Sequence, residues 1–163
     1  MLKRTILYGT GLLLLSALVM TSCNSTDKLE KQQQEEIQQF LDDNPDLHFT
    51  LKKSGLYYLE MVPGSGDFAA THDTAYLFYS IYYLDGTQVD SNFGTSDTCL
   101  FPVDEGWVIK GVDEAVTYMH EGGYCKIIVP TDIGFGNSGY PYPAYKPLLF
   151  ELYLARLVRG PVN

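Results

Sequence analysis

After residue 54 the chain consists of short segments dominated by apolar and aromatic residues, separated by polar and turn-forming residues, which predicts β-strands. The strand-like segments are rich in aromatic and β-branched residues and end at Gly, Pro or Asp-Gly turns. They cover residues 56–61, 75–83, 87–90, 99–103, 124–129 and 148–158. The last segment, which contains FELYLARLV, shows the clearest alternation. Strands of this kind bury one face of a sheet against a core.

One short helix is predicted among the strands. Residues 112–119 follow Gly111, and Asp113 and Glu114 lie in the first turn, where acidic side chains interact favourably with the helix dipole. After the strand at 124–129, residues 131–147 form a long loop rich in Gly, Pro and Tyr. An antiparallel sheet with one short helix is an α+β fold.

A second, mostly polar helix is predicted ahead of the strands, over residues 28–41. Its sequence, KLEKQQQEEIQQFL, consists of strong helix formers; Thr26 or Asp27 can cap it, and Pro45 follows it. Its apolar residues are Leu29, Ile37, Phe40 and Leu41, most of them in the last turn. We expect a spacer helix that docks by its C-terminal end, and a dimerisation helix is the alternative.

The first 23 residues have the pattern of an export signal. Lys3 and Arg4 precede an apolar run over residues 6–20, which is short for a membrane span of roughly 20 residues. Small polar residues and then Cys23 follow. The segment resembles a bacterial lipoprotein signal peptide, although Met20 stands where that pattern prefers an aliphatic residue. This resemblance implies acylation of Cys23 and attachment to a membrane of the bacterial cell envelope; an uncleaved anchor is the alternative.

Charge and composition narrow the function classes. The formal net charge is -9. Removal of residues 1–23 would take away two basic residues and leave 9 basic against 20 acidic residues, or -11. An acidic surface without a basic stripe argues against nucleic acid as a partner. The histidines, His48, His72 and His120, are isolated, so we expect surface residues and neither a metal site nor a cofactor.

The order of short motifs from Gly55 to Arg159 resembles the FKBP family of peptidyl-prolyl isomerases. The motifs that carry the resemblance are Gly64-Ser-Gly66, Tyr79, Asp85-Gly86, Asp90-Ser91, residues 108–111, residues 113–115, Met119, residues 121–123, Val129-Pro130, Phe135-Gly136 and residues 147–152. The resemblance implies a five-stranded twisted antiparallel sheet wrapped around one short helix, over residues 54–159. Residues 24–53 would then be a tether and spacer helix, and residues 160–163 a tail.

The resemblance also implies a proline-binding pocket between helix and sheet. Tyr79 and Asp90 match the family's catalytic positions. The positions that match its substrate-binding wall are Val89, Val108, Ile109, Val112, Phe135, Tyr140 and Phe150. Val89 and Cys99 stand where the family usually has Phe, Val112 replaces Trp, and Phe135 replaces Tyr. Trp107 and Tyr142 are nearby aromatics that could refill the space.

The same resemblance implies that the remaining cysteines stay apart. Cys99 and Cys125 fall on strands that the family's sheet order separates by more than the roughly 7 Å between Cα atoms that a disulfide allows. We therefore expect two free thiols.

The functional hypothesis that follows is a peptidyl-prolyl cis-trans isomerase that assists protein folding in the bacterial envelope. Its partners would be proline-containing segments of unfolded envelope proteins, with no cofactor. The alternative is an FKBP-like lipoprotein with weakened catalysis that binds peptides or a partner protein, because the replaced pocket residues remove apolar area and a hydroxyl group.

Overall fold

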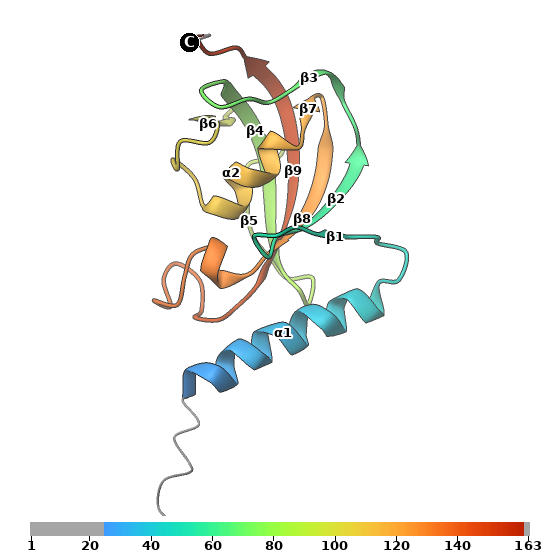
Figure 1. Ribbon diagram of the computed structural model, residues 1–163, viewed down its shortest axis with the longest axis vertical. Helices are drawn as coiled ribbons and strands as arrows, with labels where there is room; N and C mark the ends of the chain where they lie inside the picture. Colours follow the sequence, from blue (N-terminus) through green and yellow to red (C-terminus); the bar gives the residue numbers. More distant parts are fainter. Residues whose placement is uncertain (1–24, 162–163) are drawn as a thin grey trace, which may run out of the picture.

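The computed structural model describes residues 25–161 (Figure 1). The elements in chain order are α1 (Ser25–Asp43), β1 (Thr50–Leu51), β2 (Tyr57–Val62), β3 (Ser65–Phe68), β4 (Thr74–Tyr83), β5 (Gln88–Ser91), β6 (Cys99–Pro102), α2 (Lys110–Thr117), β7 (His120–Glu121), β8 (Tyr124–Val129), the 3-10 helix η1 (Thr131–Ile133) and β9 (Leu148–Val158). The predicted strands are present within one or two residues of their expected ends. Helix α2 begins and ends two residues earlier than predicted.

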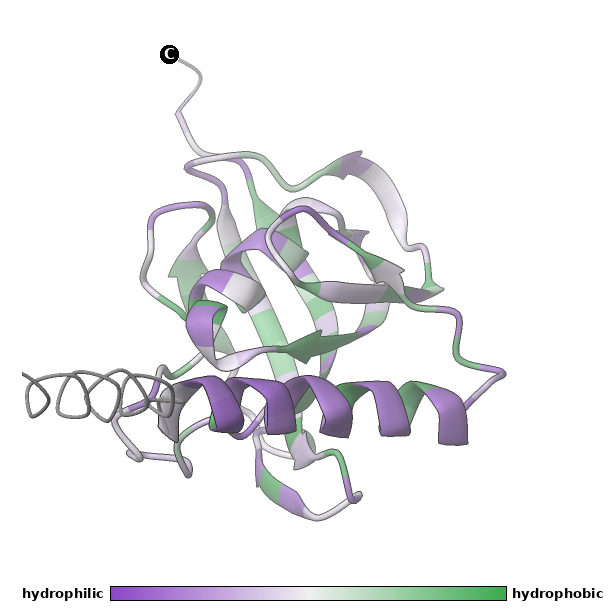
Figure 2. Ribbon diagram, turned by 60° about the horizontal axis from the view of Figure 1, so that its bottom comes forward, coloured by the Kyte–Doolittle hydropathy of each residue, from purple (hydrophilic) through white to green (hydrophobic). Residues whose placement is uncertain are grey.

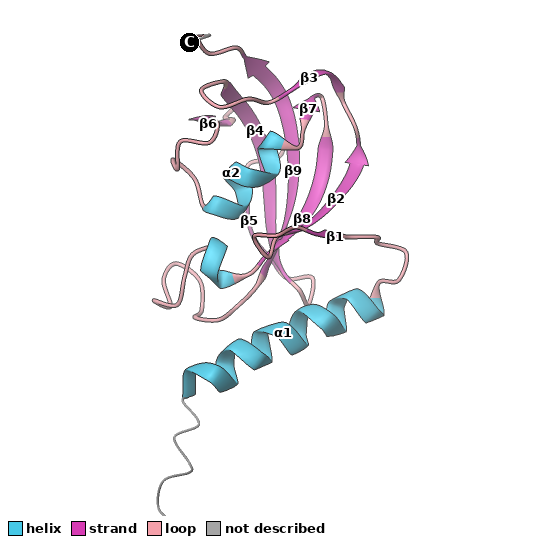
Figure 3. Cartoon of the chain, viewed as in Figure 1, coloured by secondary structure: helices cyan, strands magenta, loops and turns pink. Residues whose placement is uncertain are grey.

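The main sheet is antiparallel and has seven strands in the order β1-β2-β8-β9-β4-β5, with β6 also paired to β4 (Figure 3). Strand β6 pairs with residues 74–77 of β4, and β5 pairs with residues 80–82. These two strands therefore share one edge of β4. The expected five-stranded FKBP-like sheet corresponds to β2, β8, β9, β4 and this interrupted edge.

Three short strands were not predicted from the sequence. Strand β1 extends the main sheet beside β2, and β3 pairs with β7 in a separate two-stranded sheet. These strands have two to four residues each, too few for alternation to stand out.

The sheet buries apolar side chains on both faces. Successive residues of a strand point to opposite faces, so neighbouring positions serve different cores. The cross-strand partners Ile127 and Phe150 belong to the main core, which α2 covers. The next pair, Ile128 and Leu149, belongs to a second cluster with Ile37 of α1. Figure 1 shows α2 lying across the sheet and α1 passing below it.

Helix α1 is longer than predicted, and Thr26 and Asp27 lie inside its first turn. The helix docks through its middle as well as its end, because Gln33 is buried and Ile37 is fully buried. Figure 2 shows that most of its outward surface is hydrophilic. Ile37, Phe40 and Leu41 pack in the cluster that contains Ile128 and Leu149, so the thin apolar stripe of the helix faces the sheet.

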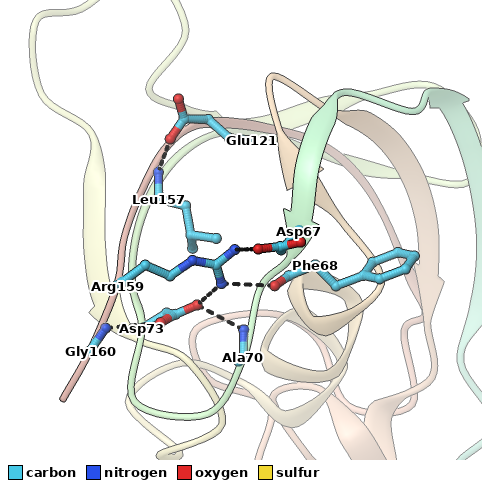
Figure 4. A network of polar contacts seen from close by, with 8 residues as sticks. All are labelled: Asp67, Phe68, Ala70, Asp73, Glu121, Leu157, Arg159 and Gly160. Carbon is cyan, nitrogen blue, oxygen red and sulfur yellow. Dashed lines mark hydrogen bonds and ion pairs between the residues drawn. The ribbon is translucent and has the colours of Figure 1, made fainter. Parts of the chain in front are cut away.

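The end of β9 is held against the segment before β4 by the buried carboxylate of Asp73 (Figure 4). Asp73 accepts hydrogen bonds from the N–H groups of Ala70 (3.0 Å) and Gly160 (2.9 Å), and its Oδ2 lies 2.6 Å from Arg159 Nη1. Burial alone would raise the pKa of Asp73, but these donors and the Arg159 guanidinium hold the pKa below its usual range.

Cys99 and Cys125 are both free thiols. Their strands, β6 and β8, are separated in the sheet by β4 and β9. The prediction of separate thiols is confirmed. Burial raises the pKa of both thiols, so neither is an activated nucleophile.

None of the helices in residues 25–161 is long and apolar enough to cross a membrane. The predicted signal peptide and Cys23 lie outside the described residues.

Candidate functional site

A cleft of about 520 Å³ lies between α2 and the sheet face that α2 covers. Its walls come from β4, β5, β6, β9, α2 with the segment before it, and the loop after β8. The lining residues are Leu77, Tyr79, Ile81, Asp90, Cys99, Trp107, Val108, Ile109, Val112, Phe135, Phe150 and Leu152. Most of these side chains are apolar, so the cleft suits an apolar group of the size of a proline ring with its flanking residues.

The sheet wall follows directly from strand geometry. Leu77, Tyr79 and Ile81 alternate along β4 and project to the same face. Phe150 and Leu152 do the same on the neighbouring β9, where Phe150 pairs with Ile81 and Leu152 with Tyr79. Leu77, Ile81 and Leu152 are not among the predicted site residues. Their period of two with Tyr79 and Phe150 is the sequence signal that could have identified them.

Helix α2 comes close to the sheet because of a glycine. A Cβ at Gly111 would lie 2.8 Å from Val129 Cγ1, so a larger residue would push the helix away from β8. Val112 follows at once and is buried, with an exposed fraction of 5%. The position of the cleft floor thus depends on the Gly111-Val112 pair.

The segment before α2 is held in place by a buried carboxylate. Asp113 accepts hydrogen bonds from the N–H groups of Asp104 (2.6 Å) and Gly106 (2.8 Å). This segment continues into Trp107, Val108 and Ile109, which line the cleft. The carbonyl of Ile109 accepts bonds from the first turn of α2, whereas none of the groups in residues 25–161 accepts one from the Ile109 N–H. That N–H can donate to a bound carbonyl group.

Tyr79 and Asp90 form the polar side of the cleft. The Tyr79 hydroxyl donates to Asp90 Oδ2 at 3.0 Å, and Asp90 Oδ1 accepts from the Ser91 N–H at 2.8 Å. Burial, together with the hydrogen bond to Asp90 and the negative charge of that carboxylate, raises the pKa of Tyr79 to about 12. The phenol is therefore neutral at physiological pH. Asn92 supports the pair, since its Oδ1 accepts from the Tyr79 N–H at 2.6 Å.

The structure brings seven of the nine predicted site residues into one cleft. They are Tyr79, Asp90, Val108, Ile109, Val112, Phe135 and Phe150. The other two predicted residues, Val89 and Tyr140, do not line the cleft. Val89 is the extra, unpaired residue of a β-bulge between Gln88 and Asp90, and it packs against the main core without lining the cleft. Tyr140 is 82% exposed, because the long loop carries it out into solvent.

Where this chain has smaller residues than the family usually has, the nearby aromatic residues Trp107 and Tyr142 do not fill the space. Cys99 and Val112 line it with small side chains. Trp107 also lines the cleft, but it is 73% exposed and stands at the rim. Tyr142 does not line the cleft; its ring packs edge-on against Phe135, with centroids 4.7 Å apart. The floor at Val112 is therefore not filled by either aromatic.

The histidines lie away from the cleft. His48 and His72 are exposed, as expected. His120 is half-buried rather than a surface residue, because its ring stacks on Phe68 with centroids 3.9 Å apart. Over the described range, 25–161, no group of three or more His, Cys, Asp or Glu residues could hold a metal ion.

The comparison with protein families agrees with this geometry. A model described as FKBP-type peptidyl-prolyl cis-trans isomerase matches residues 65–155. The chain belongs to the FKBP family. The match runs from β3 into β9 and contains all the lining residues of the cleft.

Relatives in the family include human peptidyl-prolyl cis-trans isomerase FKBP2, which is 33% identical over 89 residues. That alignment covers 53% of this chain and 63% of the human protein. The FKBP-type 22 kDa isomerase of Escherichia coli is 30% identical over 108 residues, which cover 65% of this chain and 52% of that protein. The chain thus spans about half to two thirds of the length of these relatives.

Solved structures of family members share the fold. FkpA from Escherichia coli superposes with a TM-score of 0.67 at 23% identity, covering 83% of this chain and 65% of FkpA. The isomerase from Pseudomonas syringae pv. tomato also gives a TM-score of 0.67 at 20% identity, covering 82% of this chain and 96% of that protein. The expected FKBP-like fold is confirmed.

Proposed function

We propose that this protein is a peptidyl-prolyl cis-trans isomerase that uses the cleft to bind a proline ring. The observation that carries this proposal is an apolar cleft with a neutral phenol and a carboxylate at its edge, together with the Ile109 N–H, which donates to no other group within residues 25–161. The Ile109 N–H is in a position to donate to the carbonyl of a bound peptide and so fix its orientation.

Such a cleft can accelerate isomerisation without a nucleophile. Rotation about an X–Pro bond must break amide resonance; the barrier is near 18–20 kcal/mol for a peptide bond, and the uncatalysed process takes roughly tens to hundreds of seconds. The planar amide is more polar than the twisted one. A site that excludes water therefore favours the twisted form over the planar form, which lowers the barrier.

The test is the isomerisation rate of a short X–Pro peptide with and without the purified protein. Acceleration that depends on protein concentration supports the proposal. A rate equal to the uncatalysed rate rejects it.

We further propose that the protein acts in the bacterial envelope on proline-containing segments of unfolded proteins, anchored to a membrane through an acylated Cys23. The support comes from the sequence of residues 1–23, an apolar run followed by small polar residues and a cysteine. Stable anchoring requires more than one acyl chain, which bacterial lipoproteins carry.

A peptide-binding module with weak turnover is the second candidate. Val112 and Cys99 leave the cleft wide, and Phe135 has no hydroxyl group to donate to a substrate carbonyl. A module of this kind would bind proline peptides in a titration while leaving their isomerisation rate unchanged. Binding and turnover measured on the same peptide separate the two candidates.

A further inference from the structure

Helix α1 contacts both ends of the loop over residues 131–147, which is called the cleft loop below. At the first end, Gln33 Oε1 accepts a hydrogen bond of 2.9 Å from the Thr131 N–H. Both residues are 6% exposed, so this bond is shielded from water. A buried backbone N–H needs a partner, and here the partner comes from a residue 98 positions away in the chain.

The second contact lies three residues further along the same face of α1. Glu36 Oε1 is 2.6 Å from Lys146 Nζ, and the two side chains are 25% and 35% exposed. Lys146 lies just before Pro147 and β9, at the far end of the cleft loop. Residues three apart on a helix point the same way, so Gln33 and Glu36 can hold the two ends of the loop together.

The first contact is linked directly to the cleft. The Thr131 carbonyl accepts hydrogen bonds from the N–H groups of Gly134 (3.2 Å) and Gly136 (2.8 Å). Phe135 lies between these two glycines, lines the cleft and packs against Tyr142. A displacement of Thr131 would therefore move the Phe135 wall.

Long loops with little secondary structure tend to adopt several conformations. The cleft loop has one short 3-10 helix, η1, at its start. Apolar packing of Ile37 on Ile128 and Leu149 already docks α1 on the sheet. The polar contacts of Gln33 and Glu36 lie on the cleft loop instead, so their effect should be local to it.

We propose that α1 is a positioning element of the cleft, with Gln33 and Glu36 fastening the two ends of the cleft loop and thereby setting the place of the Phe135 wall. Helix α1 precedes the residues that match the family, 65–155, so this role is additional to that match. The inference rests on the proposed function insofar as the cleft binds proline peptides.

The first test compares Gln33→Met with Gln34→Met in the full chain solubilised in detergent. Methionine keeps the length of the side chain but cannot replace the buried acceptor, and Gln34 is an exposed neighbour on the same helix. We expect Gln33→Met to accelerate amide exchange at Thr131, Gly134 and Gly136 by about tenfold, with exchange at Leu152 of β9 unchanged. KM for an X–Pro peptide should rise about three- to tenfold with little change in kcat, because a displaced wall weakens binding in both ground and transition states.

The second test reverses the ion pair. Glu36→Lys should raise KM, and the double variant Glu36→Lys with Lys146→Glu should restore it to within about twofold of the wild type. Glu35→Gln, which removes only an exposed pair with Lys31, is the control and should have no effect. If Gln33→Met does not fold, this charge-reversal experiment alone tests whether α1 positions the cleft loop.

The inference is overturned if Gln33→Met and Gln34→Met show the same exchange and the same KM, or if the double variant fails to restore KM. Should the wild type show no turnover, the proposed isomerase function fails. The inference is then decided by exchange in the cleft loop and by the affinity of the peptide in place of KM.

Discussion

Tyr79 and Asp90 are the polar side chains that face the cleft, and the hydrogen bond between them holds the phenol in place. Tyr79→Phe and Asp90→Leu should each lower isomerisation by about two- to tenfold, because a hydrogen bond contributes a net 0.5–1.5 kcal/mol, roughly. Both variants should keep the fold, which circular dichroism can check. Tyr76→Phe, a hydroxyl deletion on another residue of β4 that does not line the cleft, is the control.

The raised pKa of Tyr79 gives this pair a defined pH dependence. Because the folded-state pKa is about 12 and the ordinary value is 10.0, the stability that the neutral phenol contributes is fully present below pH 10 and is lost as pH rises toward about 12. Tyr79→Phe should remove this alkaline loss from the stability profile. An identical alkaline profile in the variant would contradict the assignment.

Val112 sets the depth of the cleft floor. Since Trp107 stands at the rim and Tyr142 outside, Val112→Trp should add apolar contact with a bound proline ring and raise peptide affinity by up to about tenfold, or about 1.4 kcal/mol. Isothermal titration with a proline peptide measures this change. A drop in affinity accompanied by a loss of about 1–3 kcal/mol in unfolding free energy would instead mean that the ring overpacks the site.

At the scale of the elements, the buried carboxylate of Asp73 holds the end of β9 against the segment before β4. Asp73→Ala removes an acceptor that serves two backbone N–H groups and Arg159, and should lower the free energy of unfolding by about 1.5–3 kcal/mol. Asp67→Ala is the matched control, because Asp67 is 95% exposed and lies 3.4 Å from the same arginine. Urea denaturation of both variants measures the difference.

The same carboxylate should give acid sensitivity. The folded-state pKa of Asp73 is lowered, so its contribution to stability is present above the unfolded pKa near 3.8 and is lost as pH falls through the folded-state value. The wild type should therefore lose more stability below pH 4, roughly, than Asp73→Ala does. Equal losses of stability in the two proteins would show that the Asp73 carboxyl is not the group whose titration destabilises the fold.

At the scale of the whole molecule, the proposed attachment to a membrane would depend on residues 1–23. Cys23→Ser should move the protein from the membrane fraction to the soluble fraction, because the residue would have no thiol to acylate. Cys99→Ser is the control and should leave the protein in the membrane fraction. Retention of the Cys23→Ser protein in the membrane fraction would favour an uncleaved anchor. Fractionation and immunoblotting distinguish these outcomes.

Much of the fold and of the cleft follows from the sequence because the signals are local. Alternation along residues 148–158 already orients Phe150, and the run of aromatic and apolar residues at 75–83 already marks the strand that carries Tyr79. Gly111 already marks the approximate start of the helix that covers them. These patterns need only a few neighbouring residues. The order of the short motifs indicated the FKBP family, and the fold of that family implied how the strands pair.

The tertiary structure decided what depends on residues far apart in the chain. It placed Tyr140 in solvent and not in the cleft, because the local sequence of a long loop with little secondary structure does not fix a single conformation. It also placed Gln33 of α1 on Thr131, a contact across 98 positions that no local periodicity encodes. From the sequence alone, Gln33 cannot be distinguished from the exposed glutamines of the same polar helix. Only the folded structure brings it next to the backbone N–H whose hydrogen bond it accepts.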